Sequence, residues 1–200
     1  MAKAEWIKTT PSSGSGNAEV QVSSTAKHSG RLARQTIIIW KAANVSNVER
    51  KVIQAGAPEN VDIEDAKAVD KNGKIVTITG ESNSAKLTFS LGTGDLDISL
   101  PATYLANSLE TDNGASILGD PGAIAVYPFS LQVVVPANNE TTSFSRQIIV
   151  TDGAGNTDVC LLTLAGGDAY LRVTEGDINL DYLGTPVSVS VESNTSWTIE

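Results

Sequence analysis

The strongest constraint on the fold of this chain is a pattern that occurs in the middle of the sequence and again near residue 200. The sequence ESNS at residues 81–84 comes after Gly73, which stands ten residues before Asn83. The sequence ESNT at residues 192–195 comes after Gly184, which stands ten residues before Asn194. Two motifs at the same spacing indicate an internal repeat.

A second pattern links the start of the chain to the middle. Arg34-Gln35 leads through three β-branched residues to Ala55-Gly56, and Arg146-Gln147 leads in the same way to Ala165-Gly166. In the middle of the chain, the ESN motif comes first and the Arg-Gln motif second. At the two ends of the chain the order is reversed, with the Arg-Gln motif near the start and the ESN motif near residue 200.

Two glycine-containing junctions, Gly56–Pro58 and Gly166–Asp168, divide the chain into residues 1–56, 57–168 and 169–200. A length of 200 residues suits two domains of ordinary size. We expect one domain at 57–168 and a second one divided between the two end segments.

The composition predicts an all-β protein. The chain has 17 Gly and 7 Pro and many β-branched residues, without apolar residues at helical spacing. Short strands bounded by turn residues are typical of a β-sandwich. The expected strands are Ala18–Ser24, Arg34–Lys41, Val48–Gln54, Ile75–Gly80, Lys86–Leu91, Phe129–Val135, Gln147–Thr151, Asp158–Ala165, Leu171–Val173, Asn179–Tyr182 and Val187–Val191.

Joined in the order 170–200 and then 1–56, the end segments resemble the BACON domain, an immunoglobulin-like module of Bacteroidetes proteins and of the bacteriophages that infect them, including crAss-like bacteriophage virion proteins. The resemblance covers nearly the whole domain. The matching residues are Tyr170–Val173, Gly184, Val187–Val191, Ser193–Trp197, Trp6-Ile7, Pro11–Asn17, Arg34 and Gln54–Gly56.

Residues 57–168 look like a diverged copy of the same module. They lack both tryptophans, have Leu164 where Gln54 would align, and carry an insertion around Asp95 to Tyr127. The resemblance implies two immunoglobulin-like β-sandwiches, one of them circularly permuted or completed in trans. It also implies that Trp6 and Trp197 are core aromatics.

Two arrangements would complete the divided sandwich. In cis, residues 169–200 fold back beside residues 1–56 of the same chain. In trans, they complete the sandwich of a neighbouring subunit, as in strand exchange and domain swapping. We favour the trans arrangement because it keeps end-to-end packing of successive domains.

The charge distribution bears on the partners. The net charge is −9, which argues against nucleic acid as a partner because phosphate contacts need clustered basic residues. Residues 1–56 carry eight basic and three acidic side chains, whereas residues 169–200 carry one and five, so their net charges are +5 and −4. This opposition favours contact between the two segments. No apolar run approaches the length of about 18 residues that spans a membrane, so no membrane is expected.

No catalytic, cofactor-binding or metal-binding constellation is visible. The single histidine, His28, lies in a polar stretch without a Gly-x-Ser-x-Gly motif, and a loop position explains it. The single cysteine, Cys160, lies between apolar residues of an expected strand and reads as a core residue. Residues 152–158 lack the ligand spacing of a calcium loop and predict a hairpin turn. We expect no enzymatic activity and no cofactor.

Two groups of residues are candidate contact sites. Ile37, Ile39 and Trp40 belong to a strand that is apolar on both faces, which predicts a protein interface. Tyr104 and Tyr127 flank the insertion, which is expected to project as a loop, and are candidates for stacking on a glycan.

We expect a non-enzymatic structural virion protein of a Bacteroidetes bacteriophage, such as a capsid auxiliary, head-fibre or tail component. Its partners would be other copies of itself and other virion proteins, with cell-surface glycan as a further candidate. The start of the sequence shows no secretory signal, which predicts synthesis in the host cytoplasm. The alternative is a carbohydrate-binding module of a secreted or cell-surface Bacteroidetes protein.

Overall fold

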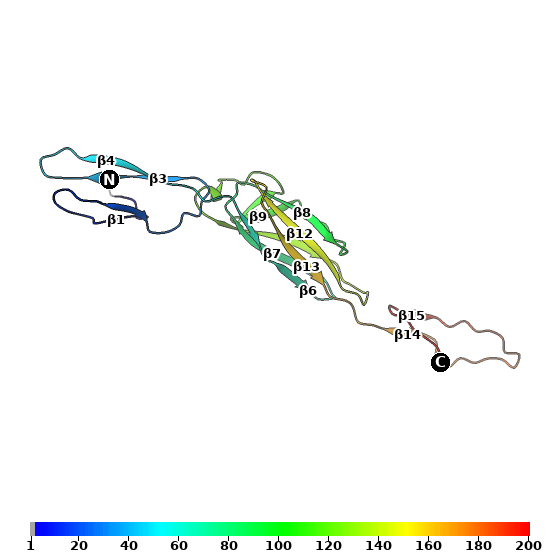
Figure 1. The fold of residues 1–200 in the computed structure, drawn as a ribbon. Coiled ribbons are helices and arrows are strands. Elements are labelled where there is room, and N and C mark those ends of the chain that lie inside the picture. Colours follow the sequence, from blue (N-terminus) through cyan, green and yellow to red (C-terminus); the bar gives the residue numbers. More distant parts are fainter. Residues whose placement is uncertain (1–2) are drawn as a thin grey trace.

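A β-sandwich formed by residues 57–168 lies in the middle of an elongated molecule, with a smaller β-structure at each end (Figure 1). The computed structural model describes residues 3–200. The all-β prediction is confirmed, since the described residues form fifteen strands and one 3₁₀ turn, η1 (Pro121–Ala123). No helix in this part of the chain is long and apolar enough to cross a membrane.

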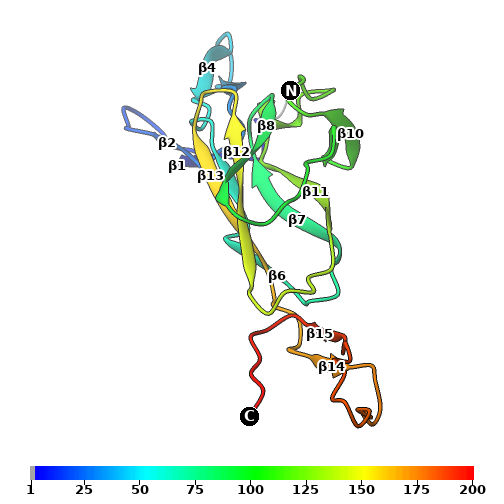
Figure 2. The same ribbon diagram turned by 90° about the vertical axis from the view of Figure 1, so that its right-hand side faces the viewer.

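Two sheets face each other in the central sandwich (Figure 2). All strand pairs are antiparallel except β6 with β13. In spatial order, the first sheet holds β10 (Leu109–Asp112), β9 (Thr103–Ala106), β11 (Tyr127–Val135), β7 (Lys74–Ser82) and β5 (Val61–Ile63). The second sheet holds β6 (Ala66–Val69), β13 (Thr157–Leu164), β12 (Phe144–Asp152) and β8 (Leu87–Gly94).

Alternation of buried and outward-facing residues along the strands builds the core between these sheets. Every second residue of β11 points inward, because successive side chains of a strand face opposite sides. The buried residues of β11 are Tyr127, Phe129, Leu131, Val133 and Val135. They pack against fully buried residues of the second sheet such as Ile148 and Leu162. The expected hairpin turn at residues 152–158 is confirmed as the β12–β13 connection.

The insertion around Asp95 to Tyr127 does not project as a loop, which corrects the expectation from its turn-rich sequence. It forms β9 and β10, which extend the first sheet, and then η1. The carbonyls of Gly122 and Ala123 accept hydrogen bonds from the backbone N–H groups of Arg31 and Leu32, at 2.9 and 3.1 Å. This backbone pairing holds the insertion against the segment before residue 57.

The segment before residue 57 forms two hairpins that lie beside each other at one end of the molecule (Figure 1). β1 (Ile7–Thr10) pairs with β2 (Gln21–Ser24), and β3 (Arg34–Trp40) pairs with β4 (Val48–Gln54). The prediction for 48–54 matches the observed bounds, whereas the strand expected at 18–24 is shorter.

The segment after residue 168 forms one short strand pair at the opposite end, β14 (Leu171–Val173) with β15 (Val191–Ser193). The strand expected at 187–191 is present only from Val191, and the one expected at 179–182 is absent from the structure. The physical reason is that these residues have no neighbouring strand to receive their backbone hydrogen bonds.

The two end segments are separated by the central sandwich (Figures 1 and 2). Among residues 3–200, no strand pair joins the segment before residue 57 to the segment after residue 168. In this structure the two end segments therefore do not pair with each other.

Candidate assembly site

The two hairpins at the start of the chain have a groove of about 580 Å³ between them. Val20 lines one wall of this groove, and Ile38 and Trp40 line the other. Ile38 is buried, but Trp40 and Val20 remain 39% and 37% exposed. We call this the open groove; its lining combines these apolar residues with polar ones such as Lys3, Thr9 and Lys41.

The predicted interface residues lie at this open groove or behind it. Ile39 and Trp40 are among the residues that line the groove. Alternation along β3 places Ile39 on the same face as Ile37, which is 49% exposed. The expected alternation along β3 is observed, because the burial of Ile38 contrasts with the exposure of Ile37. The assignment of these residues to a protein interface stays a prediction.

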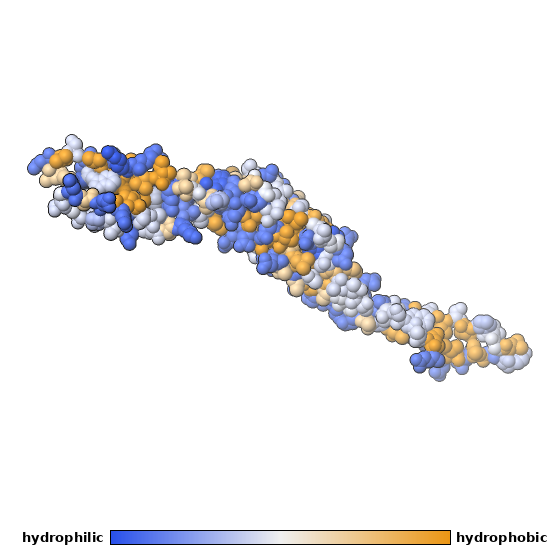
Figure 3. Space-filling model, in the orientation of Figure 1, coloured by the Kyte–Doolittle hydropathy of each residue, from blue (hydrophilic) through white to orange (hydrophobic). Residues whose placement is uncertain are grey.

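The segment after residue 168 also exposes its apolar side chains, and orange patches mark both ends of the molecule in Figure 3. Trp197 is 46% exposed, which contradicts the expectation of a core aromatic. Trp6 is half-buried beneath the Arg34 guanidinium, whose carbon lies 4.4 Å from the ring centroid. The other exposed large apolar residues after 168 are Tyr170, Leu171, Val173, Ile178, Leu180, Tyr182, Leu183, Val187 and Ile199.

A buried asparagine joins the amino-terminal segment to the central sandwich. The Asn83 side chain accepts a hydrogen bond from the Asn60 N–H at 2.8 Å. Its amide donates to the carbonyls of Pro58 and Ser29, at 2.9 and 3.1 Å. We call this arrangement the Asn83 clamp. Because it satisfies three backbone groups from two separate segments, it holds Ser29 against residues 58–60.

A second asparagine makes the same contacts at the other junction. The Asn194 side chain accepts from the Tyr170 N–H at 2.9 Å. Its amide donates to the carbonyls of Asp168 and Asn139, at 3.0 and 2.7 Å. We call this the Asn194 clamp. Each of its partners follows the corresponding partner in the Asn83 clamp by 110 residues.

The two junctions share further details. The Ser82 hydroxyl donates to the Asn60 carbonyl at 2.7 Å, and the Ser193 hydroxyl donates to the Tyr170 carbonyl at 2.9 Å. The serine and asparagine of each ESN motif are thus the residues that build each clamp. The sequence repeat revealed the positions of the clamps, but it did not reveal what they bind.

Each junction also has a position that only glycine can occupy, because a Cβ atom there would collide with neighbouring backbone. A Cβ atom at Gly56 would collide with the backbone of Arg31, and one at Gly166 would collide with that of Thr141. The offset between these pairs is again 110 residues. The geometry of the first junction is therefore repeated in the second.

One electrostatic contact is confined to the first junction. The Arg31 guanidinium lies 2.5 Å from a carboxylate oxygen of Asp120 and 3.5 Å from one of Glu59. Asp120 belongs to the insertion, which has no counterpart after residue 168. At the second junction, Lys71 pairs with the exposed carboxylate of Asp168.

Tyr104 and Tyr127, the predicted glycan contacts, are core residues, which corrects that prediction. They are 3% and 2% exposed. The Tyr104 ring packs edge-on against Phe89, with centroids 4.9 Å apart, and the Tyr127 hydroxyl donates to the Ser84 carbonyl at 2.9 Å. Neither ring face is free to stack on a sugar. Burial raises the pKa of Tyr104 to about 12 and that of Tyr127 further.

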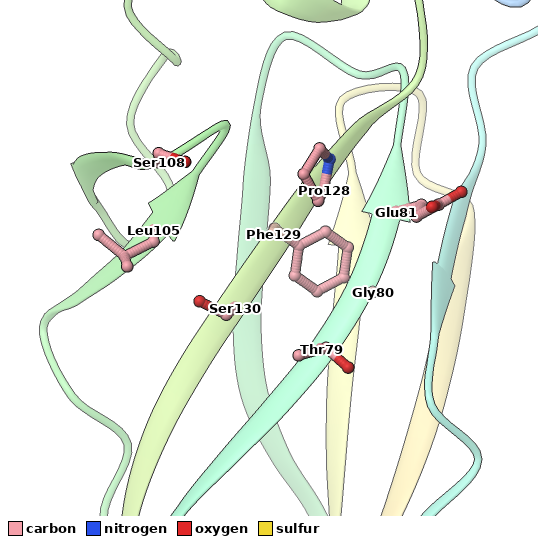
Figure 4. A pocket seen from close by; sticks show the side chains of 8 residues that line it. All are labelled: Thr79, Gly80, Glu81, Leu105, Ser108, Pro128, Phe129 and Ser130. Carbon is pink, nitrogen blue, oxygen red and sulfur yellow. The ribbon is translucent and has the colours of Figure 1, made fainter.

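The central sandwich carries a second, smaller hollow of about 360 Å³ on its first sheet (Figure 4). Glu81, Leu105 and Phe129 are among its lining residues, and Phe129 turns mainly into the core. Glu81 supplies the one carboxylate of this lining, with no histidine, cysteine or second carboxylate beside it. The chemistry of the hollow offers no acid–base pair.

The remaining candidates for chemistry are placed in structural roles. His28 Nε2 lies 2.8 Å from the Leu32 carbonyl, and Cys160 is buried in β13, where burial raises its thiol pKa to about 11. Across residues 3–200, no cluster of three His, Cys, Asp or Glu side chains could hold a metal ion.

Comparison with known protein families and with curated proteins found no match to this chain.

Proposed function

We propose that this protein is a non-enzymatic structural component of a bacteriophage particle, built from immunoglobulin-like BACON-type sandwiches and acting through its subunit interfaces. The observation that carries the proposal is the open groove together with the exposed apolar segment after residue 168. Apolar surface of this extent is typical of protein interaction sites.

The placement of these surfaces favours assembly over a ligand site. They lie at opposite ends of an elongated molecule (Figure 1), so each copy could contact two neighbours at once. Two different surfaces that meet head to tail generate closed rings or open filaments. The bacteriophage setting comes from the family resemblance.

The alternative function, a carbohydrate-binding module, loses the two residues on which it rested, because Tyr104 and Tyr127 are buried. Glycan adhesion would now require other exposed aromatics. Tyr182 is 95% exposed and Tyr170 is 51% exposed, but both lie in the apolar segment that the proposed assembly would use.

Immunogold labelling tests the proposal. Antibodies against residues 57–168 are applied to purified particles from a culture that expresses the gene, and to cell-surface fractions of the same culture. We expect gold on the particles. Label confined to the cell surface, with binding of the purified chain to a glycan array, would favour the carbohydrate-binding function instead.

A further inference from the structure

We propose that residues 169–200 of one copy complete the open groove of a second copy, so that copies join head to tail in a defined strand register. This proposal rests on the proposed structural function and deepens it. The occupant of the groove is thus a second copy of this chain.

The central sandwich provides the template for the carboxyl-terminal segment. β14 pairs with β15 as β5 pairs with β7: Leu171 lies opposite Ser193, as Val61 lies opposite Ser82. Together with the two clamps, this register identifies the segment after residue 168 as the counterpart of the first half of the central sandwich. In that first half, β7 continues toward Lys74 as a long strand.

The template also identifies the segment before residue 57. β3 and β4 pair with Arg34 opposite Gln54, where β12 and β13 have Phe144 opposite Leu164. The strand register therefore aligns Arg34 with Phe144, two residues before Arg146, with which the sequence pattern aligns it. β2 corresponds to β11, since Gln21-Val22 matches Gln132-Val133.

The amino-terminal segment lacks the strands that the template has. In the central sandwich, β11 pairs with β7 along its length, and β12 pairs with β8. Within residues 3–56, β2 has only β1 as a partner and β3 has only β4. One edge of each strand is therefore free at the open groove, and free edges are sites for strand addition.

The exposure of the groove residues shows how much of a core is lacking at the open groove. Leu131, Ile148 and Val150 occupy the central positions that correspond to Val20, Ile38 and Trp40, and they are at most 1% exposed. Two of the three groove residues remain more than a third exposed. The open groove is the empty space where strands equivalent to β7 and β8 would lie.

The register of the template predicts the new contacts. Because Val133 lies opposite Val76 and Leu131 opposite Ile78, Val22 should lie opposite Val187. By the same offset, Val20 should lie opposite Val189. Residues 185–190, which have no strand partner in this structure, would thereby gain one.

Charge favours a second copy as the occupant. The segment before residue 57 carries +5 and the segment after residue 168 carries −4. The two clamps also share one geometry, so each composite sandwich would join its neighbours as the present domains are joined. Successive copies would form a continuous line of sandwiches. Heterologous contacts of this kind extend unless the rotation closes a ring.

Paired cysteines test the register. Gln21 and Ser188 should face each other on the outer side of the sheet, as Gln132 and Thr77 do. The variant Gln21→Cys with Ser188→Cys is made in a Cys160→Ala background and oxidised. We expect a ladder of disulfide-linked dimers, trimers and larger species on a non-reducing gel.

Matched variants define the outcome. Each single cysteine should give dimers at most, and Gln21→Cys with Ser190→Cys should give no ladder, since cysteines with Cα atoms more than about 7 Å apart cannot be bridged. An equal ladder from this shifted pair would overturn the register. A disulfide-bonded monomer would overturn the trans arrangement in favour of cis.

A capped fusion tests the occupant without relying on the cysteine variants. An extra copy of residues 169–200 is placed before Met1, so that it can fill the groove of its own chain. Sedimentation should show assembly for the original chain and a monomer for the fusion. The control fusion carries Val187→Asp and Val189→Asp in the added copy and should still assemble.

A fusion that assembles as well as the original chain would contradict the proposed occupant. A chain that labels particles but neither assembles nor gives the ladder would contradict the inference while leaving the proposed function standing. In that case the groove is filled by another virion protein or by a flanking segment.

Discussion

Two asparagines, each held by three hydrogen bonds, govern the junctions between successive sandwich units. Asn83 is almost fully buried, whereas Asn194 is more exposed, because the segment around it has no covering half. Equal contacts in unequal surroundings should produce different effects on stability and on assembly.

Replacing Asn83 with Ala should lower the free energy of unfolding of the central sandwich by about 2–3 kcal/mol, because it leaves buried backbone groups without partners. Asn194→Ala is the matched control. It should leave the unfolding of the central sandwich unchanged and weaken assembly. Urea unfolding followed by far-UV circular dichroism measures the change in stability, and sedimentation measures the change in assembly. Equal destabilisation by both variants would contradict the assigned roles.

Buried acids predict a loss of stability at high pH. Burial raises the pKa of Cys160 from 9.0 to about 11, and that of Tyr104 from 10.0 to about 12. Both groups stay protonated in the folded state after the unfolded chain has begun to lose its protons. Their stabilising contribution is therefore complete below pH 9.0 and is lost as the pH rises through about 11 and 12.

Urea unfolding at a series of pH values measures this effect. We expect a flat midpoint up to about pH 9 and a progressive fall above it. In Cys160→Ala, the fall should begin about one pH unit later, where the tyrosines take over. An identical profile in the two proteins would show that the cysteine thiol does not contribute.

At the scale of elements, β12 and β3 differ in how many strands pair with them and in how fully they are covered. β12 lies between β13 and β8 and is covered by the first sheet, whereas β3 has β4 alone as a partner. Ile148 and Ile38 occupy equivalent places in these strands and are 0% and 6% exposed. The first belongs to a full core and the second to half of one.

Ile148→Ala should lower the free energy of unfolding of the central sandwich by about 2–5 kcal/mol, since it leaves a cavity in a closed core. Ile38→Ala should leave that unfolding transition unchanged and raise the concentration needed for assembly. Thermal unfolding and sedimentation of both variants provide the comparison. A large effect of Ile38→Ala on the central transition would mean that the open half and the central sandwich unfold together.

At the scale of the whole molecule, opposite charges at opposite ends should control how fast copies meet. Attraction between exposed charges is screened by salt and acts mainly on the association rate. The central sandwich carries −10 between a +5 and a −4 segment, so approach of the basic end to the acidic end is favoured over other encounters.

Raising the salt concentration from about 50 mM to about 500 mM should slow assembly several-fold, because the screening length falls from above 10 Å to a few Å. Light scattering after rapid dilution into each buffer measures the rate. The final extent of assembly should change less, since apolar burial provides most of the affinity. Faster assembly at high salt would mean that repulsion between the acidic central sandwiches dominates.

Much of the fold could be predicted because a half-buried strand requires alternating residue types, which are visible in the local sequence. Alternation located most strands of the central sandwich and the long strand β3, and the repeat located both junctions. The strands that were missed, such as β5 and β9, are short, and distant partners define them. Trp40 and Ile39 line the open groove, and their assignment to a protein interface stays a prediction. Tyr104 and Tyr127 are buried, which corrects their assignment as glycan contacts.

By itself, the sequence determined the all-β class, the repeat, the three segments and the opposite charges of the two ends, since each depends on residue types and spacing along the chain. Only the tertiary structure decided that the tyrosines are buried, that the insertion extends a sheet, and that the two end segments lie apart. The physical reason is that pairing and burial depend on which distant segments meet. A periodic segment such as residues 187–190 forms no strand until a partner edge is supplied.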